Sequence, residues 1–155
     1  MCSSDLNINK AFNIKDDVDY KGVTELYNII TGNQRKSSWS CTFMSNKEYK
    51  IWVPHLAIKD ENDTIWCKDG WQNYFSNDRK WITEIDTANH LKETPDRDFK
   101  EKRVVFMKMR DKYGKKCCRF IGVFQLRTST INNNGQIERQ YERIATEVQI
   151  DQLKR

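Results

Sequence analysis

The sequence contains few of the residues that build linkers, metal sites and disulfide frameworks. Its 155 residues include only two prolines and six glycines, too few for a linker-rich or low-complexity chain. The five cysteines are an odd number, form no C-x-x-C pair and are accompanied by only two histidines. This pattern supports neither a disulfide framework nor a tetrahedral zinc site, and we expect no metal and no cofactor.

Long hydrophobic runs are missing as well. No apolar run approaches the ~20 residues of a membrane span, and residues 1–10 lack the apolar core of a signal peptide. We therefore expect a cytoplasmic protein with no membrane contact. With 32% charged and 12% aromatic residues the composition is that of a soluble globular protein, and the length predicts a single domain over residues 1–155.

Enzyme signatures are also absent: the chain has no Gly-rich phosphate loop, no G-x-S-x-G and no H-E-x-x-H motif. Cys117 and Cys118 are candidate nucleophiles, because neighbouring cations would lower a thiol pKa. No histidine is adjacent to them in sequence, so we interpret both as structural strand residues. Glu84 and Asp86 follow no nuclease pattern and are assigned to the solvated surface. We expect a binding protein, not an enzyme.

Two apolar segments stand out in the second half of the chain. Residues 104–109 and 118–126 are apolar on both faces and are joined by a short basic connection with a turn at Tyr113 and Gly114. Strands that are apolar on both faces belong in the middle of a sheet, with other elements packed over each side. We therefore predict that this hairpin is the spine of the sheet.

Residues 20–32 predict a helix with one apolar face, capped by Asp19 and ended by Gly32. Residues 1–19 are expected to form a short edge strand or a loosely ordered arm. The fold class that we predict is α+β: a mainly antiparallel curved sheet or barrel over residues 39–150, with a flanking helix. Strand patterns cover residues 39–44, 50–56, 64–68, 81–86 and 141–150, the last with Ile144, Thr146, Val148 and Ile150 facing inward.

Positive charge is concentrated near the hairpin. The chain carries a net charge of +5, but residues 97–119 hold ten Lys or Arg against three acids, or +7, which leaves −2 for the rest. Such a surface is typical of phosphate-backbone contact. The alternative is a solvated hairpin whose lysines protect an edge from aggregation. The candidate phosphate-binding residues are Lys108, Arg110, Lys112, Lys115, Lys116 and Arg119, with Arg35 and Lys36.

A second distinctive stretch, residues 66–81, places five aromatic residues around a turn at Asp69 and Gly70. Aromatic walls with amide and carboxylate edges suit an extruded base, because the rings stack on it while Asn or Asp binds its Watson–Crick edge. Burial in the core, or an aromatic cage for a methylated cation, are the alternatives. The candidate base pocket consists of Trp66, Asp69, Trp71, Asn73, Tyr74 and Trp81.

Three segments carry a family resemblance: IWCKDGWQNYFS, then RVVFMKMRDKYGKKCCRFIGVFQL, then YERIATEV. Their order over residues 66–150 resembles the PUA/SRA/EVE-like group of small barrels that sense modified bases. It looks like a module that is attached to nucleases in modification-dependent restriction systems. The resemblance implies a curved barrel with a base-binding pocket and a basic rim, without chemistry of its own. A nuclease or other effector would then act as a partner or a fused domain.

These features together favour a nucleic-acid-binding module that recognises a modified base in DNA. Phosphate contacts would supply affinity and the aromatic pocket would supply selectivity. A non-enzymatic protein- or peptide-interaction module, with the aromatic turn as its hydrophobic anchor, is one alternative. An RNA-binding domain of similar barrel type, which stacks aromatic residues on single strands, is another. DNA is favoured over RNA.

Overall fold

The computed structural model describes residues 11–34, 36, 42–55, 58–59, 65–66, 70–90 and 99–155. Contacts divide the chain into two compact units. Among the described residues, no helix has the length and apolar character needed to cross a membrane. Unit 1 comprises Met1–Pro54, Lys102–Val123 and Ile144–Arg155, and unit 2 comprises His55–Glu101 and Phe124–Arg143.

The largest sheet is mostly antiparallel. Hydrogen bonding orders its seven strands β2-β3-β8-β9-β10-β7-β6, with β3 and β8 parallel. In the described part of the chain this order ends at β2 and at β6, so a closed barrel is not confirmed. The strands are β2 (Thr42–Met44), β3 (Tyr49–Trp52), β6 (Trp71–Phe75), β7 (Trp81–Asp86), β8 (Lys102–Arg110), β9 (Lys116–Ile131) and β10 (Ile137–Ala145).

Two further sheets have two strands each. β1 (Ala11–Asn13) pairs with β11 (Glu147–Gln149), and β4 (Ile58–Lys59) pairs with β5 (Ile65–Trp66). The prediction of a short strand near the N-terminus is confirmed for β1, whereas residues 1–10 lie outside the described residues.

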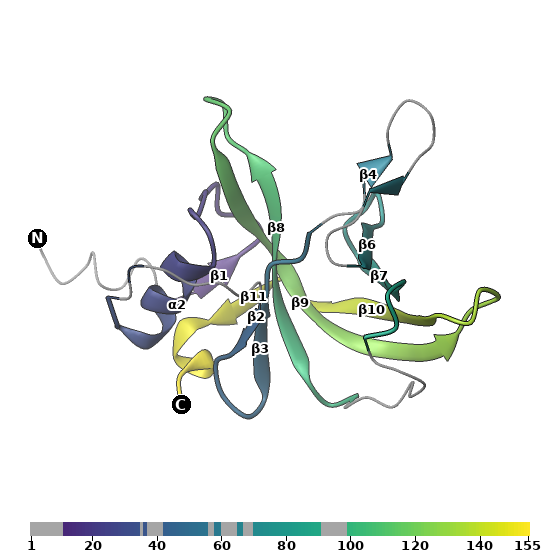
Figure 1. Cartoon of the computed structure of the whole chain (residues 1–155). Helices are drawn as coiled ribbons and strands as arrows, with labels where there is room; N and C mark the ends of the chain where they lie inside the picture. The colour runs from purple at the N-terminus through teal and green to yellow at the C-terminus, as the bar shows by residue number, and fades with distance from the viewer. Residues whose placement is uncertain are drawn as a thin grey trace, which may run out of the picture. The chain divides into compact units, whose positions relative to one another are not determined.

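The predicted spine of the sheet is confirmed. β8 and β9 are neighbours in the interior of the strand order, and Figure 1 shows them as a long hairpin whose tip projects beyond β1, β2 and β3. Val104 and Phe106 belong to the core cluster of unit 1, and Val105 and Met107, on the opposite face of β8, are also buried. Burial on both faces explains why neither face of this strand carries the usual polar alternation.

The core of unit 1 is built around aromatic rings. Phe12 of β1 packs edge-on against Phe106 of β8 at 5.0 Å between ring centroids, and Tyr20 contacts both rings. The helix α2 (Val23–Thr31) adds Leu26 and Ile30 to the same cluster. Edge-to-face pairs of this kind stabilise by about 0.5–1.5 kcal/mol each beyond the area that they bury.

The helix agrees with the prediction at its end but not at its beginning. Gly32 terminates α2 in the left-handed conformation (φ 76°), as expected. The N-terminal cap is Gly22, not Asp19, and Tyr20 is not helical because it exchanges two backbone hydrogen bonds with Cys118 of β9. Pairing with a distant strand therefore overrides the local helical pattern at residues 20–22.

The predicted last strand is divided in two. β10 ends at Ala145, β11 pairs with β1, and the chain finishes in the short helix η1 (Ile150–Leu153), which contacts α2. Val148 and Ile150 are buried as expected, but Ile144 and Thr146 are exposed. The inward assignment of these two residues was wrong because the break between β10 and β11 interrupts the two-residue alternation.

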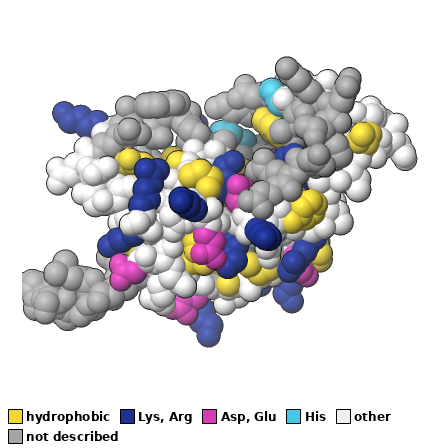
Figure 2. Space-filling view, turned by 90° about the horizontal axis from the view of Figure 1, so that it is seen from below, with side chains coloured by type: hydrophobic (Ala, Val, Ile, Leu, Met, Phe, Trp, Pro, Cys, Tyr) yellow, Lys and Arg dark blue, Asp and Glu magenta, His cyan; other side chains and the backbone are white. Residues whose placement is uncertain are grey.

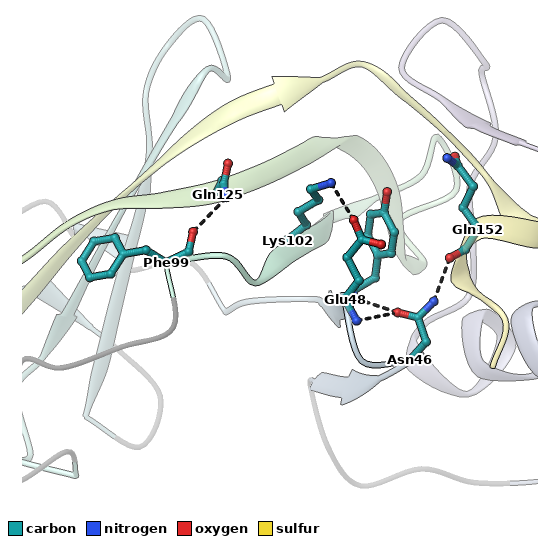
Figure 3. A network of polar contacts seen from close by, with 7 residues as sticks. Asn46, Glu48, Phe99, Lys102, Gln125 and Gln152 are labelled. Atoms are coloured by element: carbon teal, nitrogen blue, oxygen red, sulfur yellow. Dashed lines mark hydrogen bonds and ion pairs between the residues drawn. The ribbon is translucent and has the colours of Figure 1, made fainter.

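Asn46, in the β2–β3 turn of unit 1, forms hydrogen bonds with the C-terminal segment (Figure 3). The Oδ1 atom of Asn46 accepts hydrogen bonds from the backbone N–H groups of Glu48 and Tyr49, and its Nδ2 donates to the Gln152 carbonyl at 2.8 Å. The Glu48 carboxylate pairs with Lys102 at 2.7 Å. The amide thus satisfies backbone groups of two segments that are distant in sequence.

Unit 2 contains β6, β7, most of β10 and the second half of β9. Its buried apolar residues include Ile82, Phe124 and Tyr141. In the same unit, Gln125 of β9 donates a hydrogen bond to the Phe99 carbonyl at 2.8 Å (Figure 3). Residues 71–75 form a strand, although no strand pattern was assigned to them from the sequence.

A tight approach at Gly70 closes one end of β6 and β7. The backbone N–H and the hydroxyl of Thr87 both donate to the Gly70 carbonyl, at 2.8 and 2.6 Å. Gly70 has φ +80°, and a Cβ atom there would lie 2.3 Å from the Cβ of Ala88. Glycine is therefore required at this position by both conformation and space.

We predict that Gly70→Ala destabilises the protein more than Gly114→Ala. Both glycines have positive φ, and alanine in that conformation lowers the free energy of unfolding by about 1 kcal/mol. A Cβ at Gly114, however, meets no atom within 4 Å. The clash with Ala88 should add about 1–3 kcal/mol to the loss at Gly70. Urea unfolding of both variants measures the difference, and equal losses would show that the close approach does not matter.

Candidate nucleic-acid interface

The tip of the β8–β9 hairpin (residues 110–116) is a preorganised turn. The Oδ1 atom of Asp111 accepts hydrogen bonds from the backbone N–H groups of Tyr113 and Lys115, at 2.8 and 2.9 Å. The N–H of Gly114 donates to the Asp111 carbonyl, and the guanidinium of Arg110 donates to the Gly114 carbonyl at 2.7 Å. The side chains on this turn therefore project from a fixed backbone.

Four cations surround the tip. Arg110, Lys112, Lys115 and Lys116 are exposed, and among the described residues none of them is ion-paired with a carboxylate. Cations elsewhere do have such partners, as in the Arg127–Glu142 pair. On the face shown in Figure 2, Lys and Arg side chains are interspersed with Asp and Glu. The tip is therefore a cluster of four exposed cations without a carboxylate partner in the described part of the chain.

An exposed aromatic ring lies at the centre of these cations. Tyr113 is 77% exposed, and the Lys112 ammonium lies 5.2 Å from its ring centroid. From the sequence, Tyr113 was assigned only to the turn. An aromatic residue in a two-residue turn between two lysines was the sequence signal that could have identified Tyr113 as a candidate contact.

Arg119 differs from the other predicted phosphate-binding residues. Its Nη1 atom lies 2.7 Å from the Asp17 carboxylate, and its Nε atom donates to Asp19. The hydrogen bond from Arg119 holds the pKa of Asp19 below its ordinary value. Lys108 is half-buried, Lys36 is exposed, and Arg35 lies outside the described residues.

The adjacent cysteines are buried free thiols. Burial raises the pKa of Cys118 to about 12, and burial together with Asp19 and Asp111 raises the pKa of Cys117. Arg119 acts in the opposite direction on the pKa of Cys117, and Lys108 on that of Cys118, but neither reverses the shift. Both shifts oppose thiolate formation, so the geometry favours the structural interpretation of these residues.

A row of three polar side chains crosses the sheet of unit 2. Asn73 of β6 is opposite Glu84 of β7, and Glu84 is opposite Arg139 of β10. Residues that face each other in an antiparallel ladder point to the same side of the sheet, so the three lie together. All three are buried. We call Asn73, Glu84 and Arg139 the polar row.

Glu84 is held from two sides. The hydroxyl of Tyr141 donates to Glu84 Oε1 at 3.1 Å, and Arg139 Nη1 lies 3.7 Å from the same oxygen. The assignment of Glu84 and Asp86 to the solvated surface was wrong, because both are buried. They follow the buried Ile82 at two-residue intervals on β7, which places them on its inward face.

Asn73 contributes an acceptor that lacks a partner. Its Nδ2 atom donates to the His55 carbonyl at 3.1 Å, but its Oδ1 atom has no hydrogen-bond partner among the described residues. The residue is only 3% exposed. A buried acceptor without a donor costs about 1–3 kcal/mol, and such an atom in a native protein calls for an explanation such as a ligand.

Trp71 lies next to the polar row, on the same face of β6 as Asn73. Its ring is stacked on His90 at 4.9 Å between centroids and 14° between planes. The backbone N–H of His90 donates to Asp86, which is opposite Trp71 in the ladder. The structure therefore brings two of the predicted pocket residues, Trp71 and Asn73, onto one side.

Two of the other predicted pocket residues, Tyr74 and Trp81, do not join them. Tyr74 and Trp81 point to the opposite face of the sheet by the two-residue alternation. There the Tyr74 hydroxyl donates to Gln72 at 2.9 Å, and Trp81 is opposite Glu142. Asp69 and the side chain of Trp66 lie outside the described residues.

The described residues form a mostly antiparallel α+β fold with two candidate binding features. These are the cationic tip of the hairpin and the buried polar row. Within the described residues, no group of three or more His, Cys, Asp or Glu is placed to hold a metal ion. The chain belongs to the SRA (SET and RING associated) domain family, whose model matches residues 6–150. The resemblance to the SRA group is thereby confirmed.

Among solved structures, the chain is similar to the 5-hydroxymethylcytosine-specific restriction enzyme AbaSI. The two share 23% sequence identity with a TM-score of 0.71 over 95% of this chain, which is a likeness of fold. The match covers 44% of the length of that enzyme. No curated protein matches the chain.

We predict that the peptide containing Cys117 and Cys118 resists alkylation by iodoacetamide at pH 8 in the native protein. Raised pKa values keep both thiols protonated, and burial limits access. Mass spectrometry of peptides labelled before and after unfolding in urea measures the protection. A native labelling rate above that of free cysteine would instead identify an activated nucleophile.

Proposed function

We propose that this chain is a DNA-binding module that recognises a modified base. Each unit supplies one contact: the polar row of unit 2 reads the base, and the hairpin tip of unit 1 binds phosphates. Membership of the SRA family supports this function, as does a fold shared with an enzyme whose name states specificity for 5-hydroxymethylcytosine. The observation that carries the proposal is the unpaired, buried acceptor of Asn73.

The chemistry of this acceptor favours a cytosine-type base. An extruded base presents its Watson–Crick edge to the protein, and cytosine offers an N4 amino donor there. Asn73 Oδ1 accepts that hydrogen bond, whereas the O4 atom of thymine would place acceptor against acceptor. Glu84, oriented by Tyr141 and Arg139, is a second acceptor in the same row.

Trp71 supplies the stacking surface of the proposed site. Stacking of a base on an aromatic side chain contributes about 1–3 kcal/mol. Because His90 already covers one face of the indole, a base stacks on the opposite face or replaces the imidazole. Tyr74 and Trp81, on the opposite face of the sheet, are candidates only for more distant contacts. Asp69 and Trp66 remain proposed pocket residues.

The hairpin tip supplies affinity without sequence information. Arg110, Lys112, Lys115 and Lys116 are exposed on a fixed turn, which suits contact with a regular array of phosphates. Tyr113 is placed among them to pack on a sugar or base. Lys108, Arg35 and Lys36 are further proposed phosphate contacts.

The module itself is proposed to be non-catalytic and to act with an effector. The enzyme that shares its fold is a restriction enzyme of which this chain covers 44%, so cleavage would be carried out by another domain or a partner protein. A link to a restriction system and a cytoplasmic location are part of the same proposal.

We predict that Asn73→Ala weakens binding to duplexes that contain a modified cytosine by about tenfold, the value of one buried hydrogen bond. Affinity for the unmodified duplex, which in this proposal is bound through its phosphates without extrusion of a base, should not change. Fluorescence anisotropy with plain, methylated and hydroxymethylated duplexes, each at two salt concentrations, measures both effects. Matched RNA strands in the same titration test the RNA-binding alternative.

Gln72→Ala is the matched control, because Gln72 is the neighbouring amide of β6 on the opposite face of the sheet. It should leave the preference for the modified base intact. If Asn73→Ala and Gln72→Ala had the same effect on all three duplexes, the polar row would not be the base-reading site.

The hairpin gives a second prediction. Changing Lys112, Lys115 and Lys116 together to Glu should reduce DNA affinity about ten- to a hundredfold for every duplex. The slope of log affinity against log salt concentration should also become less steep by about 2.7, because each of the three lost phosphate contacts contributes about 0.9. Titration at several salt concentrations measures the slope.

A variant with Lys21, Lys47 and Lys154 changed to Glu is the control. It reverses the same amount of charge on exposed lysines of unit 1 outside the hairpin. A slope change of the same size in this control would assign the effect to net charge and remove the hairpin from the interface. Binding that does not respond to salt would favour a protein- or peptide-interaction module.

A further inference from the structure

Arg119 of β9 was predicted to contact a phosphate. In the structure its guanidinium is instead paired with two carboxylates. Asp17 binds Nη1 and Asp19 binds Nε, so two sides of the guanidinium are occupied. The three groups together carry a net charge of −1, which repels a phosphate. In this arrangement Arg119 does not act as a cation towards DNA.

The two carboxylates belong to a segment that is anchored at the base of the hairpin. Tyr20, directly after Asp19, exchanges backbone hydrogen bonds of 2.9 and 2.8 Å with Cys118, directly before Arg119. The short segment is therefore fixed in register with β9, and the carboxylates are held where they meet Arg119.

The two contacts differ in exposure. The Asp17 side chain is 84% exposed, whereas those of Asp19 and Arg119 are about one-third exposed. Exposed ion pairs contribute little to stability. Little stability would be lost if a phosphate replaced Asp17, so the guanidinium is accessible to competition.

We propose that Asp17 and Asp19 are an intramolecular competitor for DNA phosphate at Arg119. This inference rests on the proposed DNA contact of the hairpin. In the free protein the carboxylates occupy the site of a phosphate, and DNA must displace them to reach Arg119. The competition weakens all DNA binding by the same factor, so DNA that lacks the recognised base is released more readily.

Asp17→Asn combined with Asp19→Asn tests the inference. The amides keep the size of the carboxylates but lose their charge, which frees Arg119 for a phosphate. Affinity for an unmodified duplex should rise about two- to fivefold, the equivalent of an exposed ion pair. The salt slope should steepen by about 0.9, the value of one added phosphate contact.

A matched control separates competition from net charge. Asp16→Asn combined with Glu147→Gln removes the same charge from exposed side chains of unit 1, and neither residue is ion-paired among the described residues. This control should leave the salt slope unchanged. Adding Arg119→Gln to the Asp17→Asn, Asp19→Asn variant should abolish its gain, because the gain requires the freed guanidinium.

The outcomes distinguish the inference from the proposed function. If the wild type binds DNA but the Asp17→Asn, Asp19→Asn variant behaves as the charge control, or keeps its gain without Arg119, the competitor is refuted. If no variant binds DNA at all, the proposed function and the inference both fail. Asp17→Asn alone, on an exposed side chain, gives the same comparison should the double variant fold poorly.

Discussion

The fold depends on one constraint: strand β8 must be covered on both faces. Val104 and Phe106 require the cluster formed by α2, β1 and β3, while Val105 and Met107 are buried on the other side. Neither face of the strand is therefore free for a ligand. Within the β8–β9 hairpin, the tip beyond Met107 presents exposed side chains to a partner, and its backbone is fixed by Asp111.

The sequence predicted those parts of the fold that local patterns determine. The hairpin, the end of α2 at Gly32 and the bounds of β7 follow from apolar runs, a left-handed stop and two-residue alternation. The parts that were missed depend on pairing between distant segments. Tyr20 leaves the helix because it pairs with Cys118, and β11 separates from β10 because it pairs with β1.

The candidate site was predictable in composition but not in arrangement. The aromatic stretch contains both Trp71 and Asn73, but the side of the sheet on which Tyr74 and Trp81 lie became clear only once the strand was recognised. One residue of offset moves a side chain to the opposite face. Glu84 and Arg139 were missed because a polar residue on a strand indicates surface unless its register is known. Register is a tertiary property that joins β6, β7 and β10.

In the proposed function, DNA affinity and base selectivity have separate physical origins. Lysine ammonium groups at a hairpin tip bind any phosphate backbone, so extra charge there raises correct and incorrect binding alike. The polar row can discriminate, because an unpaired acceptor gains a hydrogen bond only from a base that presents a donor. The polar row can select between sites only if DNA that is bound through phosphates alone dissociates readily. The proposed competition of Asp17 and Asp19 at Arg119 lowers the affinity that comes from phosphates, which is the same for every DNA sequence. It does not change the contribution of Asn73.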